Sequence, residues 1–325
     1  MFRKLANLFG QSSQRARPNI RLAAFGKHPG WLDHMEEIGL ETDRLIQLRR
    51  MLYSEGINRN IDSGAWRDLT PEQSVAEFKH AFVWKVGPDT IVGRLWSSTD
   101  GRGRSLYPMV LAAQCENLSF AQSVFVVMPR LVLLEKQIKS TPEAKDVKRL
   151  LSSAQHDFTH SIPADGSTDS TSTIATALAR LAECEQLGPD HEGLMRILYQ
   201  VETDMADMQR TKKVESRTST MQMVRAHQIR VPRCTERITD SVLLWNDFLN
   251  EELAPSIPML MLIPLDHDWI DLVLGDPTSS HIYALKVSTG KNPLASDIPY
   301  SIPDEFKAKV QQRIEEARHA LSTKA

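Results

Sequence analysis

The stretch FVWKVGPDTIVGRLWSSTDGRGRSLYPMVLAAQC, residues 82–115, contains three apolar runs separated by two short polar segments. FVWKV (82–86), IVGRLW (91–96) and PMVLAAQC (108–115) have the length of β-strands, and glycine, proline and aspartate mark the segments between them. Such short connections join antiparallel neighbours, because a parallel pair needs a crossover of about a dozen residues. The stretch therefore predicts three consecutive antiparallel strands.

The rest of the chain adds strands and helices on both sides of this stretch. Strands are predicted at IRLAAFG (20–26), MVRAHQIRV (223–231), MLMLIPL (259–265), WIDLVLG (269–275) and HIYALKV (281–287). Apolar residues at helical spacing predict helices at 42–54, 120–139 and 142–158, with a bend at Pro129 in the second of these. Another helix is predicted over Val75–Phe82, after a cap at Thr70. Later in the chain the same spacing predicts helices at 174–187, 190–209, 240–253 and 304–321. The pattern predicts an α+β fold, mainly antiparallel and flanked by helices. Two similar α/β lobes, or one sheet built from both halves, would fit it.

The domain organisation follows from one segment without apolar periodicity. SIPADGSTDSTST, residues 161–173, is rich in Ser, Thr, Asp and Gly, so we expect a linker there. We expect a flexible leader over 1–17, an N-terminal α+β domain over 18–160, and a helical and α+β region over 174–325 that packs on the first domain.

Composition excludes some classes of partner. The chain has 325 residues with 39 Lys and Arg against 41 Asp and Glu, and the formal charge of −2 supplies no overall field that would attract nucleic acid. The three cysteines form no CxxC pair, as is usual in a reducing compartment. No run approaches the ~18 apolar residues of a membrane span, and the N-terminus lacks the continuous apolar run of a secretory signal. We therefore expect a cytoplasmic protein without a membrane span.

The glycine-rich segment DGRGRS (100–105) does not fit a phosphate-binding loop. A dinucleotide fingerprint needs GxGxxG at the start of a helix, whereas only Gly101 and Gly103 are present and a predicted strand follows. The segment GPDTIVGRL (87–95) also fails as a P-loop, because Arg94 replaces the lysine and Leu95 replaces the Ser or Thr. We expect no bound nucleotide and no other cofactor.

Catalytic and metal-binding patterns are weak. His156 and His160 are four apart on a predicted helix, but the glutamate of the zincin motif is missing, and no GxSxG nucleophile elbow occurs. We expect no enzyme and no metal site. The alternative is a small-ligand or metal-binding enzyme whose pocket is formed by His28, Asp33, His34 and Arg104.

Two loops about seventy residues apart give the chain a family resemblance. The first is FGKHPGWLDH (25–34) and the second is SSTDGRGRSLYP (97–108). Together they resemble the TagF/ImpM family of type VI secretion-associated proteins, although Leu32 and His34 stand where the family usually has glycine and an aromatic residue. The matching residues are Phe25, Gly26, Lys27, Pro29, Asp33, Ser98, Asp100, Gly103, Arg104, Tyr107 and Pro108.

This resemblance implies a non-enzymatic accessory protein of a bacterial type VI secretion system. It would act in the cytoplasm as a regulator through protein contacts, with a forkhead-associated scaffold protein as the kind of partner. The residues implied to bind the partner or to structure the loops are Gly26, Lys27, Pro29, Asp33, Asp100, Gly103, Arg104, Tyr107 and Pro108.

The residue types suggest how the two loops are built. We expect Lys27 to reach outward as a charge and Gly101 and Gly103 to allow backbone angles that other residues resist. Asp100 and Arg104 would form an ion pair, or Asp33 would pair with Arg104 or Lys27 across the loops. The loops would then form a rigid turn, either as a contact surface or only to stabilise the fold.

Overall fold

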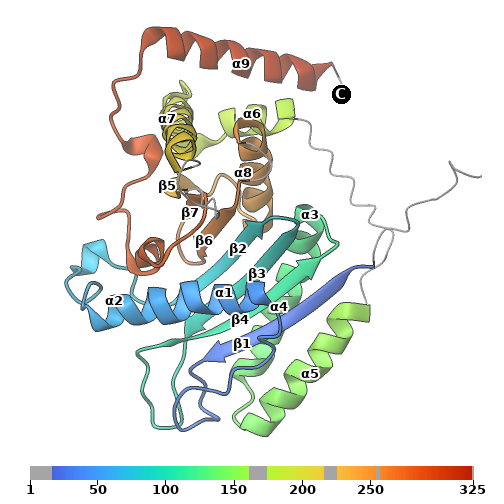
Figure 1. Ribbon diagram of the computed structural model, residues 1–325. Coiled ribbons are helices and arrows are strands. Elements are labelled where there is room, and N and C mark those ends of the chain that lie inside the picture. Colours follow the sequence, from blue (N-terminus) through green and yellow to red (C-terminus); the bar gives the residue numbers. More distant parts are fainter. Residues whose placement is uncertain (1–16, 161–173, 216–224, 254–256, 324–325) are drawn as a thin grey trace, which may run out of the picture.

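A computed structural model describes residues 17–160, 174–215, 225–253 and 257–323 (Figure 1). These residues form one seven-stranded sheet in the order β1-β4-β3-β2-β6-β7-β5. Every neighbouring pair of strands is antiparallel. The strands are β1 (Asn19–Gly26), β2 (Lys79–Val86), β3 (Asp89–Ser97), β4 (Pro108–Glu116), β5 (His227–Pro232), β6 (Met259–Pro264) and β7 (Trp269–Leu274).

The sheet confirms the three strands predicted between residues 82 and 115 and joins the two parts of the chain. A tight turn connects β2 to β3, and β3 then pairs with β4. On its other side β2 pairs with β6, with Val83 opposite Met261. Of the two arrangements that the sequence allows, the described residues therefore form one sheet built from both halves, and two separate lobes are not seen.

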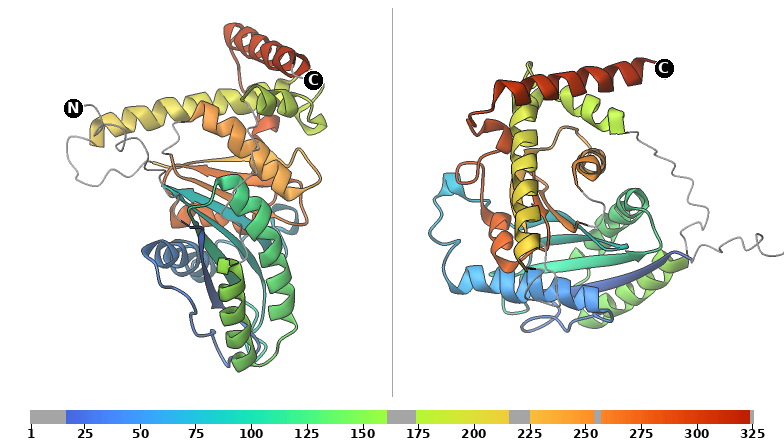
Figure 2. Two further views of the ribbon diagram at one scale, coloured as in Figure 1. Left: turned by 90° about the vertical axis from the view of Figure 1, so that its right-hand side faces the viewer. Right: turned by 45° about the horizontal axis from the view of Figure 1, so that its top comes forward.

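Helices cover both faces of the sheet (Figure 2). One face carries α1 (Asp43–Leu48), which continues through a π-helix (Arg49–Ile57) into α2 (Asn58–Asp62). The other face carries α3 (Phe120–Gln122), a π-helix (Ser123–Val127), α4 (Met128–Lys139), α5 (Ala144–His160) and α8 (Ile238–Glu252). Beyond α8 lie α6 (Ile174–Ala182), α7 (Glu192–Glu215) and α9 (Asp304–Ser322); α6 contacts both α8 and α9.

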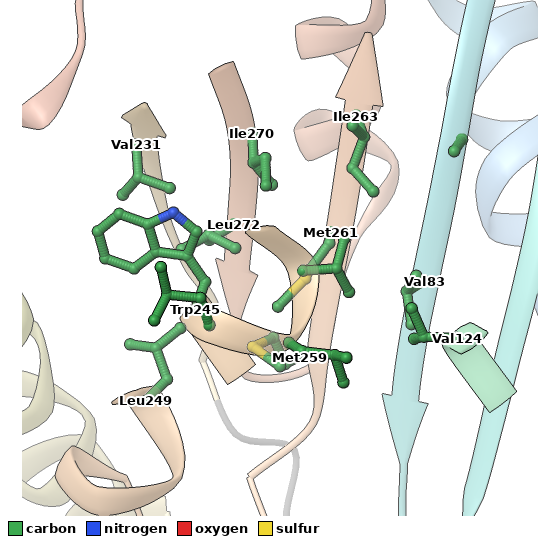
Figure 3. Packing of buried hydrophobic residues seen from close by; sticks show 14 of the residues in the cluster. Val83, Val124, Val231, Trp245, Leu249, Met259, Met261, Ile263, Ile270 and Leu272 are labelled. Carbon is green, nitrogen blue, oxygen red and sulfur yellow. The ribbon is translucent and has the colours of Figure 1, made fainter. Parts of the chain in front are cut away.

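The two faces bury separate apolar clusters, because side chains alternate along a strand. In β1, Leu22 and Ala24 face α4 and α5, whereas Ala23 and Phe25 face α1. On the α8 side, Trp245 packs against Val231, Leu249 and Leu272 (Figure 3). The Trp245 indole N–H donates to the carbonyl oxygen of Pro232 at 2.9 Å, so this large side chain leaves no unsatisfied polar group.

Two predicted elements are wrong. The cap at Thr70 starts only a single 3₁₀ turn (Pro71–Gln73), because the backbone at Ser74 is extended and the Val75 amide donates to Lys286. HIYALKV is not a strand but most of a 3₁₀ helix, η5 (Ser279–Lys286). A capping box at Thr278 and His281 starts η5, and Ile282 and Leu285 share one face at its three-residue spacing.

Several expectations on organisation concern residues that are not described. The linker over 161–173 and all but the last residue of the leader over 1–17 lie outside the described residues. Within the described ranges, no helix is long and apolar enough to cross a membrane.

Candidate interaction site at the ends of β1 and β3

The two motif loops meet at one end of the sheet. β1 ends at Gly26, which lies opposite Met109 at the start of β4, so the loop after β1 and the loop between β3 and β4 leave the sheet side by side. The Lys27 amide donates to the carbonyl oxygen of Pro108 at 3.2 Å. A Cβ at Gly26 would lie 2.2 Å from the same oxygen, and its φ is +118°. Only glycine fits this crossing of the two loops.

Asp100 is the centre of the site. Its carboxylate is buried and accepts hydrogen bonds from Lys27 Nζ at 2.6 Å and from Arg104 Nε at 2.7 Å. The amides of Arg102 and Arg104 donate to its other oxygen at 2.9 and 3.1 Å. Burial by itself would raise the pKa of Asp100, but the hydrogen bonds from Lys27, the two amides and the Arg104 side chain outweigh it. The pKa therefore lies well below its ordinary value of 3.8, and the group is a fixed anion.

Lys27 is an internal bridge. Its ammonium also contacts Asp33 at 2.6 Å, and only 4% of its side chain is exposed. The expectation that Lys27 reaches outward is therefore wrong, because the two carboxylates draw its amine inward between the loops. The pairing of Asp33 with Lys27 is confirmed.

Arg104 closes the arrangement from the outside. Its Nη2 lies 3.0 Å from Asp33 Oδ1 and donates to the carbonyl oxygen of Leu32 at 3.1 Å. The expected pairings of Arg104 with Asp100 and with Asp33 thus occur together. We call Lys27, Asp33, Asp100 and Arg104 the clasp; its two cations and two carboxylates balance in charge.

Gly101 and Gly103 hold the clasp together through the backbone. The Gly101 amide donates to the carbonyl oxygen of Trp31 at 2.7 Å. A Cβ at Gly101 would come within 3.0 Å of the carbonyl oxygen of Pro29, so a larger residue would push the loops apart. Gly103 has a φ of +77°, which favours glycine, and its amide donates to the Asp100 carbonyl at 2.9 Å. The unusual backbone angle expected at both glycines is thus found at Gly103 only, and Gly101 is needed for the close approach of the first loop.

An aromatic group packs beside the clasp. Tyr107, which precedes Pro108 at the start of β4, packs against the His34 ring at a centroid distance of 5.1 Å and against Tyr53 at 6.0 Å. Burial, followed by the charge of Lys27, lowers the pKa of His34, and burial raises the pKa of Tyr107. Tyr107 thus serves the packing of the second loop, whereas Pro108 contributes the carbonyl oxygen that accepts from the Lys27 amide.

His28 does not share a pocket with Asp33, His34 and Arg104. It is buried, its Nε2 lies 3.2 Å from the carbonyl oxygen of Ile138 in α4, and its Nδ1 accepts from the Gly30 amide at 3.0 Å. Both ring nitrogens are therefore engaged away from the clasp. In the part of the chain that the structure describes, no group of three or more His, Cys, Asp or Glu side chains is placed to hold a metal ion.

The rim of the clasp exposes two large apolar side chains that sequence reasoning missed. Leu32 in the first loop is 67% exposed and Leu106 in the second is 60% exposed. Leu106 also borders a pocket of about 570 Å³, whose wall includes Trp66 and Phe78. A leucine in a polar loop carries no periodic signal, so its exposure cannot be read from spacing.

No protein-family model matches the chain. No curated protein matches it either.

Proposed function

We propose that the protein is a non-enzymatic accessory protein of a bacterial type VI secretion system, as its resemblance to the TagF/ImpM family implies, and that it binds another protein through the face around the clasp. The observation that carries this proposal is the clasp itself. The four clasp residues Lys27, Asp33, Asp100 and Arg104, together with Gly26 and Gly103, all match the family motif, and they join two loops that are distant in sequence.

The chemistry of the clasp suits a docking face better than a catalytic centre. A general acid or base must exchange a proton near neutral pH. Asp100 is held as an anion by four donors, and Lys27 is held between two carboxylates. Asp100 therefore stays charged near neutral pH, and both side chains are positioned to hold the loops together.

The exposed rim supplies what a partner would contact. Leu32 in the first loop and Leu106 in the second are both exposed, and the Arg104 guanidinium, which donates to the Leu32 carbonyl oxygen, stays half exposed. Apolar side chains presented on a preorganised backbone bind with a smaller loss of conformational entropy than those on a loose loop. The rigid loops thus favour a specific protein contact, and a forkhead-associated scaffold protein is the partner that the resemblance suggests.

The test is affinity purification of the tagged full-length protein from its native host, with mass spectrometry of the proteins recovered. We expect the wild-type protein to recover a secretion-system component. Leu106→Asp should weaken that binding at least about tenfold while changing the free energy of unfolding by less than about 0.5 kcal/mol.

Leu133→Asp is the matched control, because Leu133 in α4 is also 60% exposed and does not belong to the clasp or its rim. Equal binding by both variants would remove the clasp face as the contact. If the wild-type protein recovers no secretion-system component and deletion of its gene leaves secretion unchanged, the proposed function is wrong. Stoichiometric metal in the purified protein would instead support the ligand-binding alternative.

A further inference from the structure

The structure brings together two cysteines that are distant in sequence. Cys184 lies between α6 and a 3₁₀ turn (Glu185–Leu187), and Cys234 lies between β5 and α8. Both residues line an open pocket of about 340 Å³, their thiols lie close enough to interact with each other, and the Cys234 thiol also donates to the carbonyl oxygen of Pro232 at 3.7 Å. Neither thiol takes part in a disulfide. Cys184 is buried and Cys234 is half-buried, so this pocket is the route by which a small solute would reach the pair.

The surroundings make the two sulfurs unequal. The interaction with Cys234, supported by the backbone amides of Gln186 and Leu187, lowers the pKa of the Cys184 thiol although burial opposes it. The same interaction and burial raise the pKa of Cys234. Because the thiolate is the nucleophilic form, we expect Cys184 to react first with an oxidant. Cys234 then attacks the oxidised Cys184 sulfur and forms a disulfide with it.

We propose that Cys184 and Cys234 are a redox modification site, which hydrogen peroxide oxidises to a reversible intramolecular disulfide. The Cys184 thiolate attacks one peroxide oxygen, the O–O bond breaks, and the leaving hydroxide takes up the proton that Cys184 had released. The Cys234 sulfur then attacks the Cys184 sulfenic acid, the S–O bond breaks, and the hydroxyl leaves as water with the Cys234 proton. Two thiols are oxidised and one peroxide is reduced to two waters.

The disulfide would connect two layers of the fold. Cys184 follows α6, which packs on α9 and α8, whereas Cys234 follows β5 at the edge of the sheet. A bond between them would tie the α6–α7 connection to the β5–α8 connection and restrict the unfolded chain between residues 184 and 234. We expect the oxidised protein to unfold about 5 °C higher than the reduced protein. This inference does not depend on the proposed function.

The third cysteine is an internal control. Cys115 is fully buried in β4, and burial raises the pKa of its thiol to about 12. It should therefore react with peroxide at least about tenfold more slowly than Cys184.

The experiment treats the reduced full-length protein with equimolar hydrogen peroxide, blocks free thiols under denaturing conditions and digests with trypsin. We expect a peptide LAECEQLGPDHEGLMR (181–196) linked to CTER (234–237), with Cys115 alkylated and the link reversed by dithiothreitol. The unfolding midpoint is measured on the same samples before and after oxidation. Cys115→Ser should keep the link, whereas Cys234→Ser should leave Cys184 as a sulfenic acid that dimedone traps.

Three results would overturn the proposal. One is three alkylated cysteines after peroxide treatment, and another is oxidation of Cys184 to a sulfinic acid without a linked peptide. The third is oxidation of Cys115 as fast as Cys184. Each is read from the wild-type protein, so none depends on a variant that fails to fold.

Discussion

Two buried aspartates in different parts of the sheet show how one residue type serves two purposes. Asp271 in β7 lies opposite Arg230 in β5, and two parallel hydrogen bonds of 3.0 and 2.9 Å join them. Arg230 is fully buried, donates to the carbonyl oxygens of Val287 and Asn292, and lies 4.8 Å from the Trp269 ring centroid. Asp100 accepts its hydrogen bonds from two side chains and two amides at the end of the sheet.

The two sites differ in the direction in which the pKa of the aspartate is shifted and in how far their side chains are exposed to solvent. Burial raises the pKa of Asp271 and outweighs the contribution of Arg230. Hydrogen bonds lower the pKa of Asp100 although burial opposes them. The Arg230 pair is closed on all sides, whereas the clasp ends in Asp33 and Arg104, which are both exposed. A closed pair can only support the fold, but an open cluster can support the fold and also shape a surface.

The largest loss of stability is expected when the buried Arg230–Asp271 pair is broken. Arg230→Met would leave the Asp271 carboxylate buried without its cation, and we expect the free energy of unfolding to fall by about 4 kcal/mol. Urea denaturation measures this. Arg233→Met is the control, because Arg233 pairs with the exposed Asp268 at 2.8 Å and should cost less than about 1 kcal/mol. Similar losses in both variants would contradict the distinction between closed and open pairs.

Breaking the clasp should lower the free energy of unfolding by less than breaking the Arg230–Asp271 pair does. Lys27→Met removes one donor from Asp100, which keeps Arg104 and the two amides, and we expect a fall of about 2 kcal/mol by urea denaturation. Lys79→Met is the matched control: Lys79 contacts Asp266 at 2.6 Å with both side chains exposed, so the change should stay within about 0.5 kcal/mol. A Lys27 effect as small as the control would mean that the clasp does not hold the loops.

The third expected effect is a change in how stability depends on pH, and it appears only at acidic pH. A carboxyl with a folded pKa below its unfolded value stabilises the fold above the unfolded value, and this contribution is lost as the pH falls through the folded pKa. Stability should therefore fall as the pH drops below about 3.8, the ordinary value for Asp100, and Asp100→Asn should make this fall shallower. Thermal unfolding measured at a series of acidic pH values tests the slope.

The same measurement of stability against pH is expected to give a different result for Asp271. Its folded pKa is raised, so its contribution is present below the unfolded value and is lost as the pH rises. Asp271→Asn should therefore not make the acid loss shallower. If Asp100→Asn keeps the wild-type slope, the difference in sign between the two aspartates is refuted.

Much of the sheet and part of the clasp could be predicted from the sequence. The strands at 82–115 follow from apolar runs and short turns, which are local properties, and ion pairs involving Asp33, Asp100 and Arg104 follow from complementary charge in two glycine-rich loops. The prediction failed at HIYALKV, because a short apolar run has the length of either a strand or a helical turn. It also failed for Lys27, since charge alone does not tell whether a side chain has an internal partner.

Local pattern by itself determined the α+β class and the strands of the central stretch, because the alternation of apolar residues and the turn residues act over only a few positions. Only the tertiary structure decided that β2 joins β6 in one sheet, that Lys27 is buried between two carboxylates, and that Cys184 meets Cys234. Those features depend on which distant segments share a face, and that is set by how the whole apolar surface is buried.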